Sequence, residues 1–146
     1  MNKEEFDKFL TDRYNKEVSW YDRRAKRNQL LYTIFQWAAI CLSALTPFLI
    51  VIGEVWSKWL AVAVAVLVAI STAALKAFKY QENWINYRTT CETLRKEIYF
   101  YEAGIQGYDT VADKEALFVE RVESLISREN TLWLMTHEKE EHSKRK

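Results

Sequence analysis

Two long stretches of this sequence contain no charged residue. No Lys, Arg, Asp or Glu occurs in the 26 residues between Arg27 and Glu54, or in the 17 residues between Lys58 and Lys76. At about 1.5 Å per helical residue the shorter stretch is about 25 Å long, and its flanking lysines can extend it toward the roughly 30 Å of a bilayer core. Because lipid cannot satisfy exposed peptide groups, each stretch must be a helix. We therefore predict two membrane spans.

The competing prediction is a soluble helical hairpin buried in a larger core. The average composition would suit it, with 28% charged residues and a formal net charge of +1. The chain has only 146 residues, however, which leaves too little protein to cover two such helices. The run AVAVAVLVAI would be apolar on both faces of a strand, so it lacks the alternation of apolar and polar residues expected for a strand with one solvent-exposed face. We therefore expect an all-α integral membrane protein.

The short connection GEVWSK makes the two spans an antiparallel transmembrane hairpin that continues into a cytoplasmic helical bundle, as one domain. In chain order we predict a cytoplasmic amphipathic helix (1–29), a first transmembrane helix (30–52), an external loop (53–58), a second transmembrane helix (59–77), a cytoplasmic helix (78–103), a C-terminal cytoplasmic helix (109–136) and a charged tail (137–146).

Basic residues predict the orientation. The loop between the spans carries only Lys58, whereas Lys76, Lys79 and Arg88 follow the second span. Four more precede the first span and are candidates for fixing topology and for binding lipid head groups: Arg23, Arg24, Lys26 and Arg27. The positive-inside rule then places both termini in the cytoplasm of a multi-pass protein in the cell's inner (plasma) membrane. Aromatic belts are expected at Trp56 and Trp59 and at Tyr80 and Trp84.

The cytoplasmic segments carry apolar residues at helical spacing. The N-terminal set is Phe6, Leu10, Tyr14, Val18, Tyr21 and Ala25, and the set that directly continues the second span is Trp84, Tyr87, Cys91, Leu94, Ile98 and Tyr101. The latter is an a/d seam, which we expect to pair with the N-terminal helix or with its own copy in another subunit. Gly104 and Gly107 should end that helix, and Asp109 or Thr110 should cap the next. The last helix presents Phe118, Val122, Leu125, Leu132 and Trp133 on one side.

The first span carries a polar stripe. At about 100° per residue, five positions fall within an arc of roughly 80° and are candidate pore-lining residues: Thr33, Gln36, Ile40, Ser43 and Pro47. Copies of the stripe could line a pore, or Gln36 and Ser43 could hydrogen-bond to the second span of the same subunit. Pro47 should free the carbonyl of Ser43 and act as a hinge, a fixed kink or the end of the helix.

The second span has a small residue at every fourth position: Ala61, Ala65, Ala69, Ala73 and Ala77. Such a ridge allows helices to approach closely, within the hairpin or between subunits. A lone hairpin encloses no lumen, so conduction requires a homo-oligomer, most simply with cyclic symmetry.

Other function classes lack a signature. No glycine-rich phosphate loop or nucleophile elbow occurs, so we predict neither an enzyme nor a cofactor. Basic and acidic residues are interspersed, which argues against a nucleic-acid partner. We expect Cys41 and Cys91 to be buried small residues. No metal site is predicted, because His137 and His142 are five residues apart and do not share a helix face.

Four blocks of the sequence, taken in order, resemble the SLATT class of bacterial two-transmembrane proteins. These blocks are RYNKEVSWYDRRAKRNQLLY, LSALTP, NWINYRTTCETLRKEIYFY and LFVERVESLISRENTLW. The resemblance implies a homo-oligomeric pore-forming effector of anti-phage defence or nucleotide signalling, with membrane lipids and a cytoplasmic sensor protein as partners, and no catalytic residues. The prediction is therefore a membrane pore or ion channel. The alternative is a non-conducting membrane scaffold or adaptor that binds a cytoplasmic partner through its helical bundle.

Overall fold

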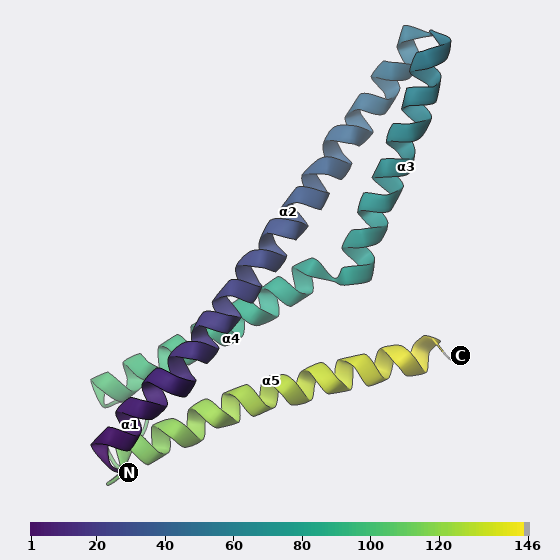
Figure 1. Ribbon diagram of the computed structural model, residues 1–146. Coiled ribbons are helices and arrows are strands. Elements are labelled where there is room, and N and C mark those ends of the chain that lie inside the picture. Colours follow the sequence, from purple (N-terminus) through teal and green to yellow (C-terminus); the bar gives the residue numbers. More distant parts are fainter. Residues whose placement is uncertain (145–146) are drawn as a thin grey trace. The chain divides into compact units, whose positions relative to one another are not determined.

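The structure is a computed structural model that describes the backbone of residues 1–144 and the side chains of residues 1–128 and 131. Every regular element in this part of the chain is a helix (Figure 1): α1 (Lys3–Phe9), η1 (Leu10–Tyr14), α2 (Asn15–Ile52), α3 (Val55–Phe78), α4 (Tyr80–Ala103) and α5 (Lys114–Lys144). They form two compact units. The bundle unit comprises residues 1–22 together with the chain from residue 87 onward, and the hairpin unit comprises residues 23–86.

The N-terminal helix continues without a break from Lys3 to Ile52, and no glycine and no proline occurs in it before Pro47. A capping box between Asn2 and Glu5 starts it. Residues 10–14 form a π-helix, η1, which accommodates one extra residue in the turn. Phe6 and Tyr14 are eight residues apart and would diverge by about 80° on a regular α-helix. The extra residue realigns them, so both side chains are buried.

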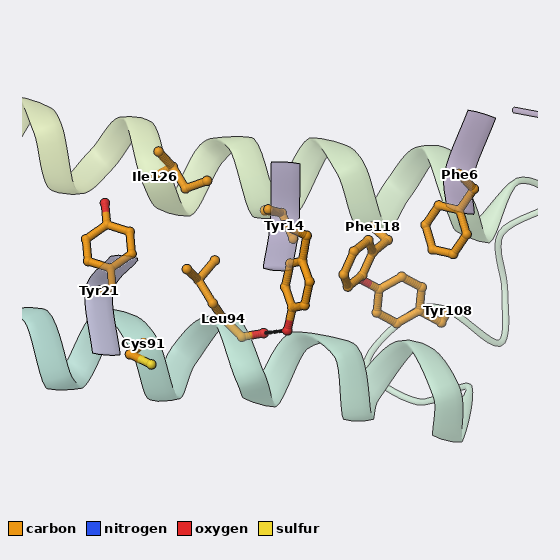
Figure 2. Close-up of a cluster of buried hydrophobic side chains, with 9 residues drawn as sticks. Phe6, Tyr14, Tyr21, Cys91, Leu94, Tyr108, Phe118 and Ile126 are labelled. Atoms are coloured by element: carbon orange, nitrogen blue, oxygen red, sulfur yellow. Dashed lines mark hydrogen bonds between the residues drawn. The ribbon is translucent and has the colours of Figure 1, made fainter. Parts of the chain in front are cut away.

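The core of the bundle unit forms where the N-terminal helix packs on α4 and α5 (Figure 2). Phe118 of α5 is fully buried, and its ring lies 5.6 Å from that of Phe6 and 5.5 Å from that of Tyr14. Cys91 and Leu94 of α4 are also fully buried, and the Tyr14 hydroxyl donates to the Leu94 carbonyl at 2.9 Å. The predicted a/d seam of α4 therefore pairs with the N-terminal helix of the same chain.

The turn between α4 and α5 differs from its prediction at one end. The chain leaves α4 at Gly104, which has a φ of 63°, as expected. Asp113 rather than Asp109 or Thr110 caps α5, because its carboxylate accepts from the Ala116 amide at 2.9 Å. The helix continues to Lys144, beyond the expected residue 136. The side chains of Leu132, Trp133, His137 and His142 lie outside the described residues.

A buried carboxylate fixes this turn. Glu97 of α4 is only 8% exposed and accepts a hydrogen bond of 2.6 Å from the Tyr108 hydroxyl. Arg121 of α5 pairs with the same carboxylate at 3.1 Å and donates to the Gln106 carbonyl at 2.8 Å. Burial and the hydrogen bond to the carboxylate raise the pKa of Tyr108. The turn and both helices are thus held by one charged pair.

The hairpin unit holds the two uncharged stretches. Both lie in helices long and apolar enough to cross a membrane. Of the most apolar 18-residue segment of each helix, only 11% and 17%, respectively, is buried within the chain. The turn is tighter than the predicted loop over 53–58, because only Gly53 and Glu54 separate α2 from α3. Gly53 has a φ of 80°, a conformation that favours glycine. Pro47 lies inside α2, so it does not end the helix.

A single residue separates α3 from α4, where the sequence predicts one continuous helix. Lys79 adopts the left-handed conformation, with a φ of 47° and a ψ of 39°. The Asn83 side chain donates to the Phe78 carbonyl at 3.0 Å and so caps the end of α3. The Tyr80 ring stacks on the Phe35 ring of α2 at 5.9 Å, with the two planes 3° apart. Capping and stacking hold a break that contains neither glycine nor proline.

Candidate functional site

The contact between α2 and α3 is built from small and branched residues. In the uncharged part of α2 the buried positions are Ala39 and Leu49, and on α3 they include Ala61 and Val64. Apart from Ala74, the buried and half-buried positions of α3 alternate four and three residues apart: Ser57, Ala61, Val64, Val68, Ser71 and Leu75. This heptad spacing keeps one seam facing α2 over the length of the helix.

The polar stripe of α2 lies outside this contact. Its five predicted residues are all exposed in the single chain: Thr33, Gln36, Ile40, Ser43 and Pro47. At about 100° per residue, the centre of the stripe is about 130° around the helix from the seam that faces α3. No hydrogen bond from Gln36 or Ser43 to α3 is present among the described residues.

The stripe residues differ in how their polar groups are satisfied. The Thr33 hydroxyl donates to the Gln29 carbonyl of its own helix at 2.8 Å. Thr46, beside the stripe, donates to the Leu42 carbonyl at 3.0 Å. The Gln36 side-chain amide is exposed and has no recorded partner within the described residues. An amide in hydrocarbon without a partner costs several kcal/mol, so in a membrane this group would require water or another polar side chain.

The rest of the α2 circumference is apolar and exposed. This third face comprises Leu30, Ile34, Trp37, Cys41, Leu45 and Phe48. Ile34 is 52% exposed and Trp37 is 62% exposed, which suits contact with lipid chains. The prediction that Cys41 is buried is therefore wrong for the single chain, whereas Cys91 is fully buried. The segment thus has three distinct faces, and only the stripe is polar.

The predicted alanine ridge of α3 packs within the chain at one end only. Ala61 is buried against α2, whereas Ala65, Ala69, Ala73 and Ala77 are exposed. A spacing of four advances about 40° per step, so the ridge turns away from a seam that alternates four and three. Contact between subunits remains a prediction for the exposed part.

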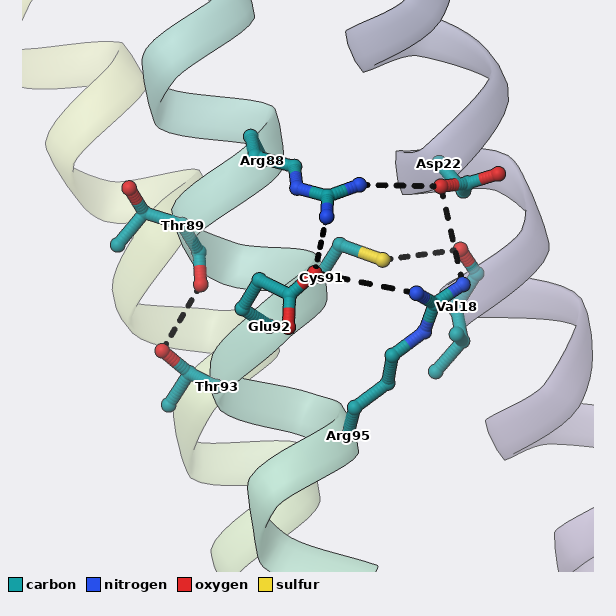
Figure 3. Close-up of polar contacts among 8 residues, drawn as sticks. All are labelled: Val18, Asp22, Arg88, Thr89, Cys91, Glu92, Thr93 and Arg95. Atoms are coloured by element: carbon teal, nitrogen blue, oxygen red, sulfur yellow. Dashed lines mark hydrogen bonds and ion pairs between the residues drawn. The ribbon is translucent and has the colours of Figure 1, made fainter.

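Some of the charged residues beside the first uncharged stretch form ion pairs between α2 and α4, and others have exposed side chains. Asp22 of α2 lies 3.7 Å from both Arg88 and Arg95 of α4, and Arg88 also pairs with Glu92 at 2.6 Å (Figure 3). Close by, the Cys91 thiol faces the Val18 carbonyl at 3.7 Å. All four residues predicted to fix topology are exposed: Arg23, Arg24, Lys26 and Arg27. Exposure leaves them accessible to phosphate head groups, so that prediction stands untested.

The aromatic residues predicted at the two ends of the spans behave differently. Trp56 and Trp59 are 60% and 72% exposed. At the other end, Tyr80 stacks on Phe35, and Trp84 stacks on Tyr32 at 6.4 Å. These stacks join α2 to the start of α4, a role that the belt prediction did not foresee.

Comparison with protein families assigns the chain to a family. The family model described as a protein of unknown function, DUF4231, matches residues 16–116, more than half of the chain. The chain belongs to the DUF4231 family. No curated protein and no solved structure matches the chain. The match identifies an uncharacterised family, and the SLATT resemblance stays a prediction.

The DUF4231 match includes α2, α3 and α4 almost completely and ends three residues into α5. It therefore contains the stripe and one more residue that the sequence analysis missed. Gln29 is exposed and lies seven residues before Gln36, which itself lies seven before Ser43. With Thr33, Ile40 and Pro47 the set alternates four and three apart, and this heptad spacing was a readable signal. Among the described residues, no cluster of three or more metal-ligating side chains occurs.

Proposed function

We propose that this DUF4231 protein forms a homo-oligomeric pore in a lipid bilayer, with the polar stripe of α2 from each copy facing a central axis. The observation that carries the proposal is the exposure of Gln36, Ser43 and Thr33 on a face turned away from α3. In a bilayer this face must meet water or other polar groups. The apolar third face of the same helix is suited to lipid, so the stripe is the natural contact between copies.

The finer assignments belong to the same proposal. The SLATT resemblance supports a bacterial effector that acts in the plasma membrane and is controlled by a cytoplasmic sensor protein. The basic residues that precede the uncharged part of α2 and follow the uncharged part of α3 support cytoplasmic termini. The scaffold alternative relied on the a/d seam of α4 and on the terminal helix as docking surfaces, and the chain's own N-terminal helix occupies that seam. The pore is therefore the better supported function.

Flux through liposomes tests the pore. We expect the purified protein to release a trapped small-ion dye, and Gln36→Leu and Ser43→Leu to reduce that release at least tenfold because they remove the polar lining. Cys41→Leu is the matched control, since Cys41 is exposed on the lipid-facing side of the same helix. Equal release by all four proteins, or none by the wild type across lipid compositions, refutes the proposal.

Contact between copies is tested separately by disulfide trapping in membranes. In a Cys41→Ser background, Gln36→Cys should cross-link copies, because the stripe faces the axis. Ile34→Cys, which is exposed on the lipid-facing side, should not. Cross-linking of Ile34→Cys alone would place the wrong face of α2 at the contact.

A further inference from the structure

The stripe is interrupted by one apolar layer. Ile40 lies between Gln36 and Ser43 on the same face of α2, and its side chain is 50% exposed. At about 1.5 Å per residue, Gln36 lies about 6 Å to one side along the helix axis and Ser43 about 4.5 Å to the other. The apolar layer is thus about 10 Å thick and has a polar layer on each side.

We propose that Ile40 is the hydrophobic gate of the pore: in the resting assembly a ring of Ile40 side chains expels water and blocks ions for most of the time, so the unchanged protein releases dye only slowly. This inference rests on the proposed function and adds its mode of closure. A narrow apolar constriction dewets, and ions cannot cross it without their hydration shells. No charged residue lies between Arg27 and Glu54, so no side chain of this stretch attracts ions into the ring by its charge.

The residue type suits this role. Isoleucine is β-branched and holds essentially one rotamer at the first side-chain torsion of a helix, so the ring cannot open by side-chain rotation alone. Opening requires α2 to move or rotate, which would turn Ile40 from the axis. Pro47 is the next apolar stripe residue, but it lies only five residues from the end of α2 at Ile52, close to the membrane surface.

The hairpin provides a matched comparison. Ile34 belongs to the same helix and is 52% exposed, against 50% for Ile40, yet it lies about 120° away from Ile40 around the helix. A polar substitution at either position removes the same apolar side chain from a similarly exposed site. Only the substitution at Ile40 should admit water to the stripe.

The test measures resting dye release from liposomes containing Ile40→Ser, Ile34→Ser or the unchanged protein at equal density. We expect Ile40→Ser to raise the rate at least tenfold and Ile34→Ser to leave it within twofold of the unchanged protein. Ile40→Val, which keeps the β-branch, should leak less than Ile40→Ser. Equal leakage from Ile40→Ser and Ile34→Ser overturns the gate.

The outcome separates the gate from the pore itself. If Gln36→Leu abolishes release while Ile40→Ser behaves like the unchanged protein, the pore stands and the gate is wrong. If no variant releases dye, including Ile40→Ser, both proposals fail. Size-exclusion profiles that match the unchanged protein establish that each variant assembles, so a loss of signal is not a loss of folding.

Discussion

Removing one hydroxyl group should loosen the α4–α5 turn of the bundle unit measurably. The change is Tyr108→Phe, which keeps the ring in its fully buried position and deletes only the donor to Glu97. The ring also keeps its contact with Arg121, whose guanidinium carbon lies 4.8 Å from the ring centre. The substitution therefore isolates one hydrogen bond to a buried carboxylate.

The geometry sets the expected size of the effect. Hydrogen bonds to charged groups contribute about 1.5–3 kcal/mol, and the bond here is short at 2.6 Å with an acceptor only 8% exposed. Arg121 still pairs with Glu97 at 3.1 Å, so the carboxylate is not left alone and the loss should be about 2 kcal/mol. That corresponds to roughly a thirtyfold change in an opening equilibrium.

Hydrogen exchange in the intact, detergent-solubilised protein measures this equilibrium at the amides of residues 114–126. Tyr101→Phe is the control, because the Tyr101 hydroxyl bonds to Glu115 at 3.1 Å in a partly exposed setting and should contribute under about 1 kcal/mol. Protection that falls less than threefold in Tyr108→Phe, or equally in both variants, would show that the buried pair does not hold α5.

Three further outcomes concern stability. Burial raises the pKa of Tyr14 to about 12, so the folded chain keeps a proton that the unfolded chain releases near pH 10. As pH rises from 10 to 12, melting experiments should show that the unchanged protein loses about 2 kcal/mol more stability than Tyr14→Phe, because Tyr108, whose pKa is also raised, titrates in both proteins. Deleting Thr11 should convert η1 to α-helix and leave the melting temperature within a few degrees, whereas deleting Val18 from regular helix should lower it strongly. Lys79→Gly should stabilise the α3–α4 joint by about 1 kcal/mol and Asn83→Ala should destabilise it similarly, again by melting in detergent.

The helices of the hairpin were predictable because each contains a long stretch of sequence without charged residues. The lack of charge between Arg27 and Glu54 needs no knowledge of packing, and α2 ends at the predicted Ile52. The start of α3 was placed four residues late, at Trp59 instead of Val55. Polar residues near a membrane surface can be helical as readily as looped, so charge alone cannot mark that boundary.

Departures from regular helix were not predictable, because their causes are contacts between elements. The π-helix at residues 10–14 corrects the register of Phe6 and Tyr14 against Phe118, a residue more than a hundred positions away. The break at Lys79 has no glycine or proline to announce it and depends on stacking against Phe35. Within the chain only Ala61 of the alanine ridge is buried, since a strict spacing of four cannot follow a heptad seam, and contact between subunits through the rest of the ridge stays a prediction.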